Sequence, residues 1–244
     1  MRYGIFSDIH ANLEAFQAVL EALSSEKIDT YLFLGDVVGY GADPAACIAV
    51  LERLCKEHPC MCIAGNHDRA ACGMTSIEQF NIHARIAAEW TRDQLGGDDL
   101  AYLERLELVK HCDDCSIVHS TLKAPAEWGY IFDIDDADEN VKLLERQVCF
   151  IGHSHQPLVF AADEMVDCFK TERLELRHSN KYIVNVGSVG QPRDGDARAS
   201  YAVFDTAKRV IEIRRVEYDV AKAQSKIMKA GLPRILSERL SRGK

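Results

Sequence analysis

The segment Arg2–His10, RYGIFSDIH, holds the pattern from which the fold can be inferred. Its short apolar run is expected to form a buried strand, and the run ends in two polar residues, Asp8 and His10. Apolar residues at helical spacing follow within 12–26, and the continuous apolar run YLFL occupies 31–34. This order of buried strand, helix and buried strand is typical of parallel strands joined by a right-handed crossover.

The same alternation continues over the next hundred residues. Asp43 and Pro44 predict the N-cap and first residue of a second helix, which extends to about Glu57. Periodicity then predicts, in order, a strand at 60–64, helices at 76–94 and 98–106, a strand at 115–119, a helix near 136–144 and a strand at 148–151.

The pattern changes at Leu158, after which strand candidates follow one another with little helix between them. They lie at 158–161, 174–176, 182–186, 201–204 and 210–215. We expect them to form a second, mainly antiparallel sheet packed on the first. A helical, basic tail begins at about residue 219, with a break at Gly231–Pro233. The predicted fold is therefore of the α/β class, a four-layer α-β-β-α sandwich. Two mixed sheets pack face to face with flanking helices, in a single domain spanning 1–244.

Composition limits the classes of function. The chain has 244 residues, of which 47% are hydrophobic and 27% charged, which is ordinary for a globular protein. A net charge of −9 argues against long nucleic acid as a partner, because nucleic-acid binding depends on basic patches. No run approaches the ~18 apolar residues of a membrane span. The N-terminus has no signal-peptide pattern, so we expect a cytoplasmic protein with no membrane partner.

The nine cysteines are accordingly expected to be reduced thiols. Cys112 and Cys115 form one CxxC pair. A structural zinc site needs four ligands, usually as two close pairs, so this pair favours neither a zinc nor a redox function by itself.

Residues that commonly bind metals follow five of the predicted strands. They occur in the segments Asp8-Ile9-His10, Gly35-Asp36, Gly65-Asn66-His67-Asp68, His119 and Gly152-His153-Ser154-His155. Any one of these alone is more often a turn residue or a satisfied loop histidine. In open α/β sheets, however, ligands bind in the crevice beyond the carboxyl ends of the strands. Five coincidences of this kind predict that the segments meet at one site.

The types of side chain indicate which metals the site would bind. Carboxylate, amide and imidazole groups together suit Mn, Fe, Co or Zn, whereas Mg and Ca sites use almost only oxygen ligands. His153 and His155 are alternate residues of an extended segment, so their rings point the same way and a cation would explain their proximity. The other four histidines are expected at the surface or in ordinary loops: His58, His83, His111 and His178.

The order DxH, GD, GNH(D), H and GHxH resembles the calcineurin-like metallophosphoesterase superfamily, over a span from Asp8 to His155. The segments DIHANLEAF, GDVVGYGADP, GSVGQPRDGDARASYAVFD and GLPRILSERL extend the likeness almost to the C-terminus. They are similar to its prokaryotic diadenosine-tetraphosphatase-like and phosphodiesterase-like members. Two segments depart from the common pattern of the superfamily, HST after the fourth strand and NVGS at 185–188.

The resemblance implies two divalent transition metal ions, with manganese favoured in assays. Asp8, His10 and His155 would hold one ion. Asn66, His119 and His153 would hold the other, and Asp36 would bridge the two opposite a hydroxide.

The resemblance also implies roles for two residues that are not metal ligands. His67 would be the general acid near the leaving-group oxygen, and Asn12 would contact the substrate or the shell of the first metal. The implied reaction is hydrolysis of a phosphate ester by in-line attack of the metal-bridging hydroxide. The substrate would be a small phosphodiester, phosphomonoester or nucleotide polyphosphate. A protein phosphatase of the same fold and a non-catalytic scaffold are the alternatives.

Arg193 lies in the loop 190–196 and has two possible functions. A guanidinium can bind two phosphate oxygens at once, so Arg193 could bind the substrate phosphate. It could equally pair with Asp194, with Asp196 or with an aspartate outside the loop, and so hold the loop. Trp128 and Tyr130 could likewise stack on a nucleobase or belong to the core.

Overall fold

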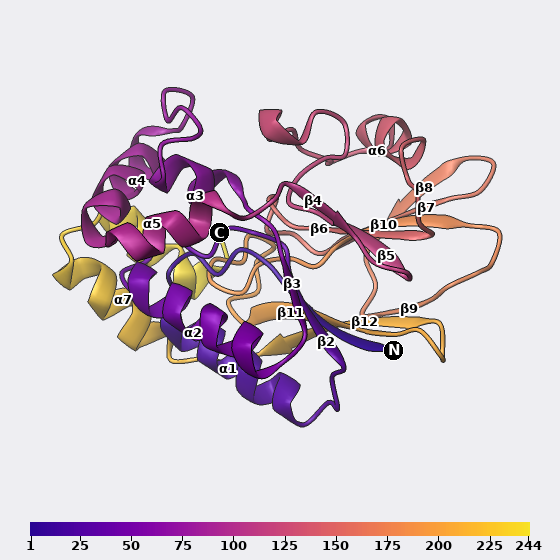
Figure 1. Cartoon of the computed structure of the whole chain (residues 1–244), viewed down its shortest axis with the longest axis horizontal. Helices are drawn as coiled ribbons and strands as arrows, with labels where there is room; N and C mark the ends of the chain where they lie inside the picture. The colour runs from indigo at the N-terminus through magenta and orange to yellow at the C-terminus, as the bar shows by residue number, and fades with distance from the viewer.

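The computed structural model describes residues 1–244, and its architecture is the predicted one: two mixed six-stranded sheets packed face to face, with helices outside them (Figure 1). The first sheet has the order β3-β2-β1-β11-β12-β9. Its strands are β1 (Arg2–Phe6), β2 (Thr30–Phe33), β3 (Cys60–Cys62), β9 (Arg173–Glu175), β11 (Ala199–Asp205) and β12 (Val210–Val216). β1, β2 and β3 are parallel to one another, and β11 is antiparallel to β1.

The second sheet has the order β4-β5-β6-β10-β7-β8. Its strands are β4 (Val109–His111), β5 (Cys115–Val118), β6 (Val148–Ile151), β7 (Leu158–Ala162), β8 (Val166–Phe169) and β10 (Lys181–Asn185). β5, β6 and β10 are parallel, and antiparallel strands flank them on both sides. The five segments with predicted metal-binding residues follow the carboxyl ends of five strands, namely β1, β2, β3, β5 and β6.

Eight α-helices complete the fold. They are α1 (Leu13–Ser24), α2 (Pro44–Glu57), α3 (Asn66–Ala71), α4 (Ile82–Gln94), α5 (Gly97–Glu104), α6 (Ile134–Val141), α7 (Val220–Lys229) and α8 (Arg234–Glu238). Short 3-10 turns lie at Pro125–Glu127 and Leu240–Arg242. No helix is both long enough and apolar enough to cross a bilayer.

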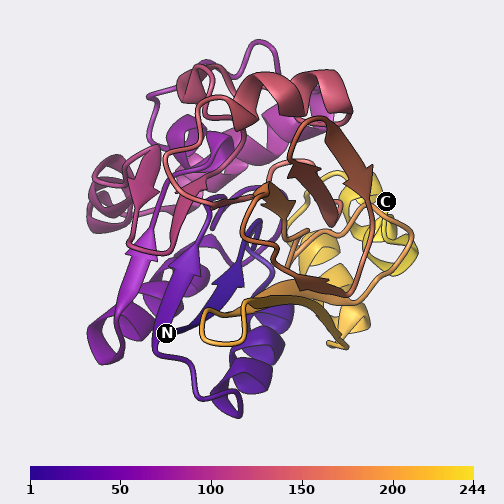
Figure 2. The ribbon, with the colours of Figure 1, turned by 90° about the vertical axis from the view of Figure 1, so that its right-hand side faces the viewer.

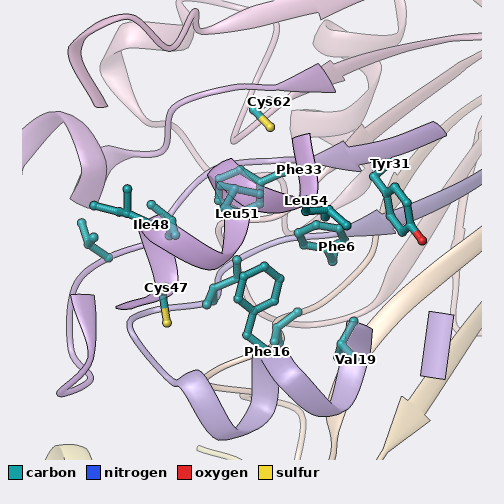
Figure 3. Close-up of a cluster of buried hydrophobic side chains, with 14 of the residues drawn as sticks. Phe6, Phe16, Val19, Tyr31, Phe33, Cys47, Ile48, Leu51, Leu54 and Cys62 are labelled. Atoms are coloured by element: carbon teal, nitrogen blue, oxygen red, sulfur yellow. The ribbon is translucent and has the colours of Figure 1, made fainter. Parts of the chain in front are cut away.

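Three buried clusters separate the layers. The helices α1 and α2 cover the first sheet, and Phe16 and Leu51 pack there against Phe6 and Phe33 (Figure 3). Between the sheets, side chains such as Ile5 from one sheet meet residues of the other. A third cluster seals α6 against the outer face of the second sheet. The hydrophobic faces of both sheets are thus covered, so a site can form only at the rim where the strands end.

The expected division of the strands between the sheets is wrong. The strands after Leu158 do not form a separate antiparallel sheet, because β9, β11 and β12 join the first sheet while β7, β8 and β10 join the second (Figure 2). The chain crosses between the layers several times. Which strands pair depends on contacts between residues that are distant in the sequence, and the local periodicity of apolar residues does not predict such contacts.

Two local expectations also need correction. The helix predicted at 76–94 begins only at Ile82, because the Asn81 side chain accepts hydrogen bonds from two backbone N–H groups and caps it there. Asp43 stands at the N-cap position of α2 but makes no capping hydrogen bond, and its carboxylate instead pairs with Lys226 at 2.8 Å. The short edge strands β4 and β8 were not predicted.

Candidate metal centre and its cavity

Four of the five strand ends place carboxylate and imidazole groups in one buried cluster. Single ligand atoms of Asp8, His10 and His155 lie within 4.8 Å of one another, as do those of Asp8, Asp36 and His119. His155 Nε2 is 3.2 Å from Asp8 Oδ1, and His119 Nε2 is 3.3 Å from Asp36 Oδ2. All five side chains are almost completely buried. The first predicted ligand set and the predicted shared carboxylate are therefore adjacent.

The backbone fixes which nitrogen of each histidine faces the cluster. Nδ1 lies against a backbone carbonyl oxygen in His10 (3.1 Å, Val38), in His119 (2.8 Å, Leu34) and in His155 (2.6 Å, Gln191). A carbonyl oxygen only accepts, so each Nδ1 carries a hydrogen, and in the neutral ring each Nε2 presents a lone pair. This is the arrangement found around metal-binding histidines, whose outer nitrogen donates to a carbonyl or carboxylate.

These donor groups fit divalent cations. The Nε2 atoms of His10 and His155 are only 3.0 Å apart, so two lone pairs face each other. Asp8 Oδ1, His119 Nε2 and Asn66 Oδ1 are buried without a hydrogen-bond partner. A buried acceptor without a hydrogen-bond partner lowers the free energy of unfolding unless an ion or another polar group binds to it. Cations between them would do so, and the mixture of carboxylate, amide and imidazole ligands suits transition metals.

The electrostatics of the cluster also favour positive charge. Burial by itself lowers the pKa of His119, but the Asp36 and Asp8 carboxylates outweigh burial and raise that pKa to about 9. Burial would raise the pKa of the Asp8 and Asp36 carboxyls, yet the neighbouring imidazoles hold both well below the ordinary range. Burial, reinforced by Arg193, lowers the pKa of His155 to about 3. His155 is thus a neutral imidazole, the form that binds metals.

Left-handed backbone conformations are concentrated at the cluster. The φ angles are 55° at Asp8, 49° at His10, 61° at Asp36, 66° at His153 and 60° at His155. Such conformations are unfavourable for residues other than glycine and persist where surrounding contacts impose them, commonly at functional sites. This feature has no signal in the sequence.

The sequence predicts no role for Asp68, but its carboxylate joins two of the loops. Its Oδ2 accepts from the backbone N–H groups of Asp36 (2.7 Å) and Gly65 (3.0 Å), and its Oδ1 accepts from Val38 (3.2 Å). It thereby holds the loop after β2 against the start of α3. The available signal was its position in GNHD, three residues after Gly65, where a carboxylate completes a capping box.

Asn185, the last residue of β10, holds the GHSH segment, Gly152–His155, in place through its side-chain amide. Its amide donates to the Gly152 carbonyl oxygen (2.6 Å) and to Ser154 Oγ (2.9 Å). Gly152 leaves no room for a side chain, because a Cβ there would overlap with Ser7 and Asp8. The segment that carries His153 and His155 is therefore held from both sides.

His67 lies in the first turn of α3, beside the cluster. One of its ring nitrogens is within 4.8 Å of the ligand atoms of His10 and Asp36, and its buried Nδ1 has no hydrogen-bond partner. Gly39 (φ +92°) makes this position possible, since a Cβ there would be 2.5 Å from Nδ1. Burial lowers the pKa of His67 well below its ordinary value, although Asp36 acts in the opposite direction.

The second predicted ligand set is gathered less tightly. Asn66 is buried with its Oδ1 free, and the His153 ring lies beside that of His119 with 5.0 Å between centroids. His153 Nε2, however, lies 3.0 Å from the Trp128 carbonyl oxygen, which leaves Nδ1 as its available ring nitrogen. The His153 ring also stacks on Tyr130, with centroids 4.1 Å apart.

Asn12 makes hydrogen bonds within the protein and is not among the residues that line the cavity over the cluster. Its Oδ1 accepts from Ala15 N (3.2 Å) and caps α1, and its Nδ2 donates to the Gly190 carbonyl oxygen (2.9 Å). The side chain is buried and both ends of its amide are used within the protein. Asn12 therefore connects the loop after β1 with the loop that carries Arg193.

A cavity of about 630 Å³ opens over the cluster. Its floor includes Asp36, Asn66, His67, His153 and His155. Residues of the α3–α4 connection and the start of α4 form one wall, residues 126–130 form another, and Tyr40 and Arg193 complete it. Trp128 and Tyr130 thus line the cavity, whereas Trp90 is not among its lining residues and packs against a hydrophobic cluster.

The remaining histidines and cysteines lie outside this site. His58, His83, His111 and His178 are all exposed, as predicted. All nine cysteines are free thiols. Cys168 is exposed, whereas Cys47 and Cys149 are buried.

Comparisons with known proteins agree with this geometry. Residues 1–209 match the model of the calcineurin-like phosphoesterase superfamily domain. An uncharacterised protein of Methanocaldococcus jannaschii is 38% identical over 246 residues, which cover 98% of this chain and 97% of the relative. The crystal structure of a metallophosphoesterase from Sphaerobacter thermophilus is 39% identical, with a TM-score of 0.87 over 100% of this chain and 99% of the other. Phosphodiesterase YfcE of Escherichia coli is 27% identical over 84% of this chain and 88% of its own length.

Proposed function

The chain belongs to the calcineurin-like phosphoesterase superfamily and is therefore a hydrolase of phosphate esters, and we propose that it acts through two divalent metal ions held at the cluster described above. The observation that carries this proposal is the gathering of three imidazoles and two carboxylates in one buried cluster, in which Asp8 Oδ1 and His119 Nε2 have no hydrogen-bond partner. Groups of these types, with buried acceptors left free, suit a cation site.

The proposed ligands form two sets that share one carboxylate. One ion would be held by Asp8, His10 and His155, and the other by Asn66, His119 and His153, with Asp36 shared. Two bound cations would polarise the phosphoryl group and lower the pKa of the attacking water. Manganese is the metal we favour for assays.

The side chains of the protein supply the remaining chemistry. His67 lies at the cavity floor beside Asp36, where it would protonate the leaving-group oxygen as general acid. The negative charge of a bound phosphate would favour the protonated ring that this role needs.

Arg193 is proposed to bind the phosphate. The two aspartates of its own loop pair with other residues: Asp194 pairs with Arg215, and Asp196 pairs with Arg198 at 2.7 Å. No aspartate outside the loop forms an ion pair with Arg193 either. The Arg193 guanidinium instead lines the cavity, 5.6 Å from the centroid of the Tyr40 ring. A guanidinium free of carboxylates at the edge of the site is suited to phosphate oxygens.

A small phosphodiester is the substrate class that we favour. The cavity is within the range of small-molecule sites and is much larger than a phosphate group needs. Its two walls, which include Phe80 on one side and Trp128 and Tyr130 on the other, could each receive one ester group. The name of the E. coli relative supports this choice. We keep the cytosol as the proposed compartment, since all nine cysteines are free.

A substrate panel with purified protein and Mn²⁺ tests the proposal. We expect bis-p-nitrophenyl phosphate to be hydrolysed with higher kcat/KM than p-nitrophenyl phosphate, diadenosine tetraphosphate or a phosphoserine peptide. Asp8→Asn should abolish turnover, and the matched control His83→Ala, at an exposed histidine, should leave it unchanged. Preference for the phosphopeptide would instead support the protein-phosphatase alternative, and absence of turnover on every substrate would support a scaffold.

A further inference from the structure

We propose that Gln191 and Arg239 are positioning residues for Arg193, which makes the C-terminal tail, residues 219–244, part of the active site. This inference rests on the proposed function, in which Arg193 binds the substrate phosphate. It assigns a role to a segment that lies beyond residue 209, where the match to the family model ends.

Gln191 connects three parts of the molecule. Its backbone carbonyl oxygen accepts from His155 Nδ1 at 2.6 Å and so sets the orientation of that ring. Its side-chain Oε1 accepts from Arg193 Nε (3.3 Å) and Nη2 (2.8 Å), and from Arg239 Nη1 (3.1 Å). The residue is 1% exposed, and its backbone N–H donates to Ser188 Oγ at 2.8 Å. One fixed amide therefore orients both a proposed metal ligand and the proposed phosphate-binding side chain.

Arg239 is a half-buried cation with no Asp or Glu side chain paired to it. It shares one neutral oxygen with Arg193, and neither guanidinium pairs with an Asp or Glu side chain. Burial and the nearby positive charge of Arg193 lower the pKa of Arg239. Two guanidinium groups on one acceptor repel each other, and Arg239 is kept in place by the tail, where its Nε donates to the Lys244 backbone oxygen at 2.6 Å. The repulsion favours a conformation of Arg193 directed away from Arg239, on the cavity side.

The tail is well anchored for this purpose. Lys226 in α7 pairs with Glu14 of α1 at 2.6 Å and with Asp43 at 2.8 Å. Ile227, Leu236 and other apolar tail residues pack in a cluster that includes Tyr40, the ring near Arg193. Figure 1 shows α7 lying along α1 on the outer side of the first sheet.

The end of the tail also contacts the Arg193 loop directly. The Gly195 N–H donates to the Gly243 carbonyl oxygen at 2.9 Å. A Cβ at Gly243 (φ +60°) would lie 2.7 Å from backbone atoms of Asp196, so the two segments are in close contact. The loop is therefore bounded by the tail along much of its length.

A double-mutant cycle tests the inference, with Arg239→Ala, Arg193→Ala and the double variant. The probe is inorganic phosphate as a competitive inhibitor of the Mn²⁺-loaded enzyme, measured as Ki beside KM, kcat and Tm. We expect Arg239→Ala to raise Ki and KM roughly 2- to 10-fold, the effect of about one hydrogen bond, with kcat little changed. Arg239→Lys, which keeps one donor, should recover part of the loss. In the Arg193→Ala background, removing Arg239 should have no further effect on Ki, since its action passes through Arg193.

Arg234→Ala is the matched control, because Arg234 lies in the same tail, is 78% exposed and pairs only with Glu238. It should leave Ki unchanged. If Arg193→Ala weakens phosphate binding but Arg239→Ala does not, or if the two effects simply add, the positioning role is wrong while the proposed function stands. If Arg193→Ala has no effect on Ki, the proposed role of Arg193 fails first. A lower Tm for Arg239→Ala with unchanged Ki would show a purely structural contact.

Discussion

At the scale of single residues, Asp36 has the most connected position in the site. Its Oδ1 accepts from the His67 backbone N–H at 2.8 Å, while its Oδ2 is 3.3 Å from His119 Nε2 and 3.6 Å from His10 Nε2. The carboxylate thus faces residues of both proposed ligand sets. A charge shared by two cations offsets their mutual repulsion, which no single-site ligand does.

Asp36→Asn is therefore expected to be the most damaging exchange among the proposed ligands. It nearly keeps the shape of the side chain but removes the shared charge. We expect at least one metal ion to be lost, and a fall in kcat/KM beyond the roughly 10- to 100-fold typical of lost outer-shell partners. Elemental analysis and steady-state kinetics measure both effects. Two tightly held ions together with a near-normal rate would contradict the shared role.

His67→Ala should separate acid catalysis from metal binding. If His67 is the general acid, the variant keeps both metal ions and loses roughly 10²- to 10⁴-fold in rate. The loss should shrink for substrates that release p-nitrophenolate, which leaves without needing a proton. Because the His67 ring lies within 4.8 Å of ligand atoms of His10 and Asp36, the metal content decides the question. Loss of an ion from the variant would make His67 a ligand.

Much of the site was predictable at this scale, because metal-binding residue types followed recognisable strands. Asp68, Asn185 and Gln191 were not, since their roles consist of hydrogen bonds to residues that are distant in the sequence or to backbone groups. Asn12 shows the reverse case. The resemblance implies a contact with the substrate or with the shell of the first metal, whereas in the structure its amide caps α1 and links two loops.

At the scale of elements, the geometry of the site depends on hydrogen bonds that fix the backbone of the loops, and not on the strands alone. Asp68 closes a capping box at the start of α3 and also binds the loop after β2. Periodicity predicted most of the strands that precede these loops. It could not predict how the strands after Leu158 divide between the sheets, because the register of β10 with β6 or β11 with β1 joins residues far apart in sequence.

Asp68→Asn should disturb both stability and metal binding. One of its oxygens accepts two N–H groups, and an amide could not satisfy all three donors of the cluster. We expect a loss of about 1–3 kcal/mol in the free energy of unfolding, the cost of an unsatisfied buried polar group. Metal affinity should fall roughly 10- to 100-fold, since the position of Asp36 depends on this carboxylate.

Asp99→Asn provides the control for this prediction. Asp99 forms the equivalent capping box with Gly96 at the start of α5, at an exposed helix end remote from the cavity lining. It should lower stability slightly and leave metal affinity unchanged. Equal effects of the two exchanges on metal affinity would contradict a specific role for Asp68. Urea unfolding and metal titration measure the two quantities.

At the scale of the whole molecule, the metal site is built from both sheets. Asp8 and Asp36 follow strands of the first sheet, whereas His119 and His155 follow strands of the second. Ions bound between these groups would therefore connect the two halves of the sandwich. The sequence indicated that the strand ends meet, but it placed the early strands in one sheet and so gave no sign that the site lies between two sheets.

This arrangement predicts that divalent metal ions stabilise the entire fold. A ligand that binds only the native state adds RT ln(1 + [L]/Kd), which is about 2.7 kcal/mol at a concentration 100-fold above Kd. For a chain of this size each kcal/mol raises Tm by roughly 2–4 °C, so Mn²⁺ added to chelated, desalted protein should raise Tm by several degrees. Turnover should disappear with the metal and return with it. Asp36→Asn should show a smaller Tm shift, because the exchange weakens binding at the junction of the sheets. Full turnover by protein whose metal content is confirmed as absent, or a Tm unaffected by Mn²⁺, Co²⁺ and Zn²⁺, would contradict a metal centre that joins the two sheets.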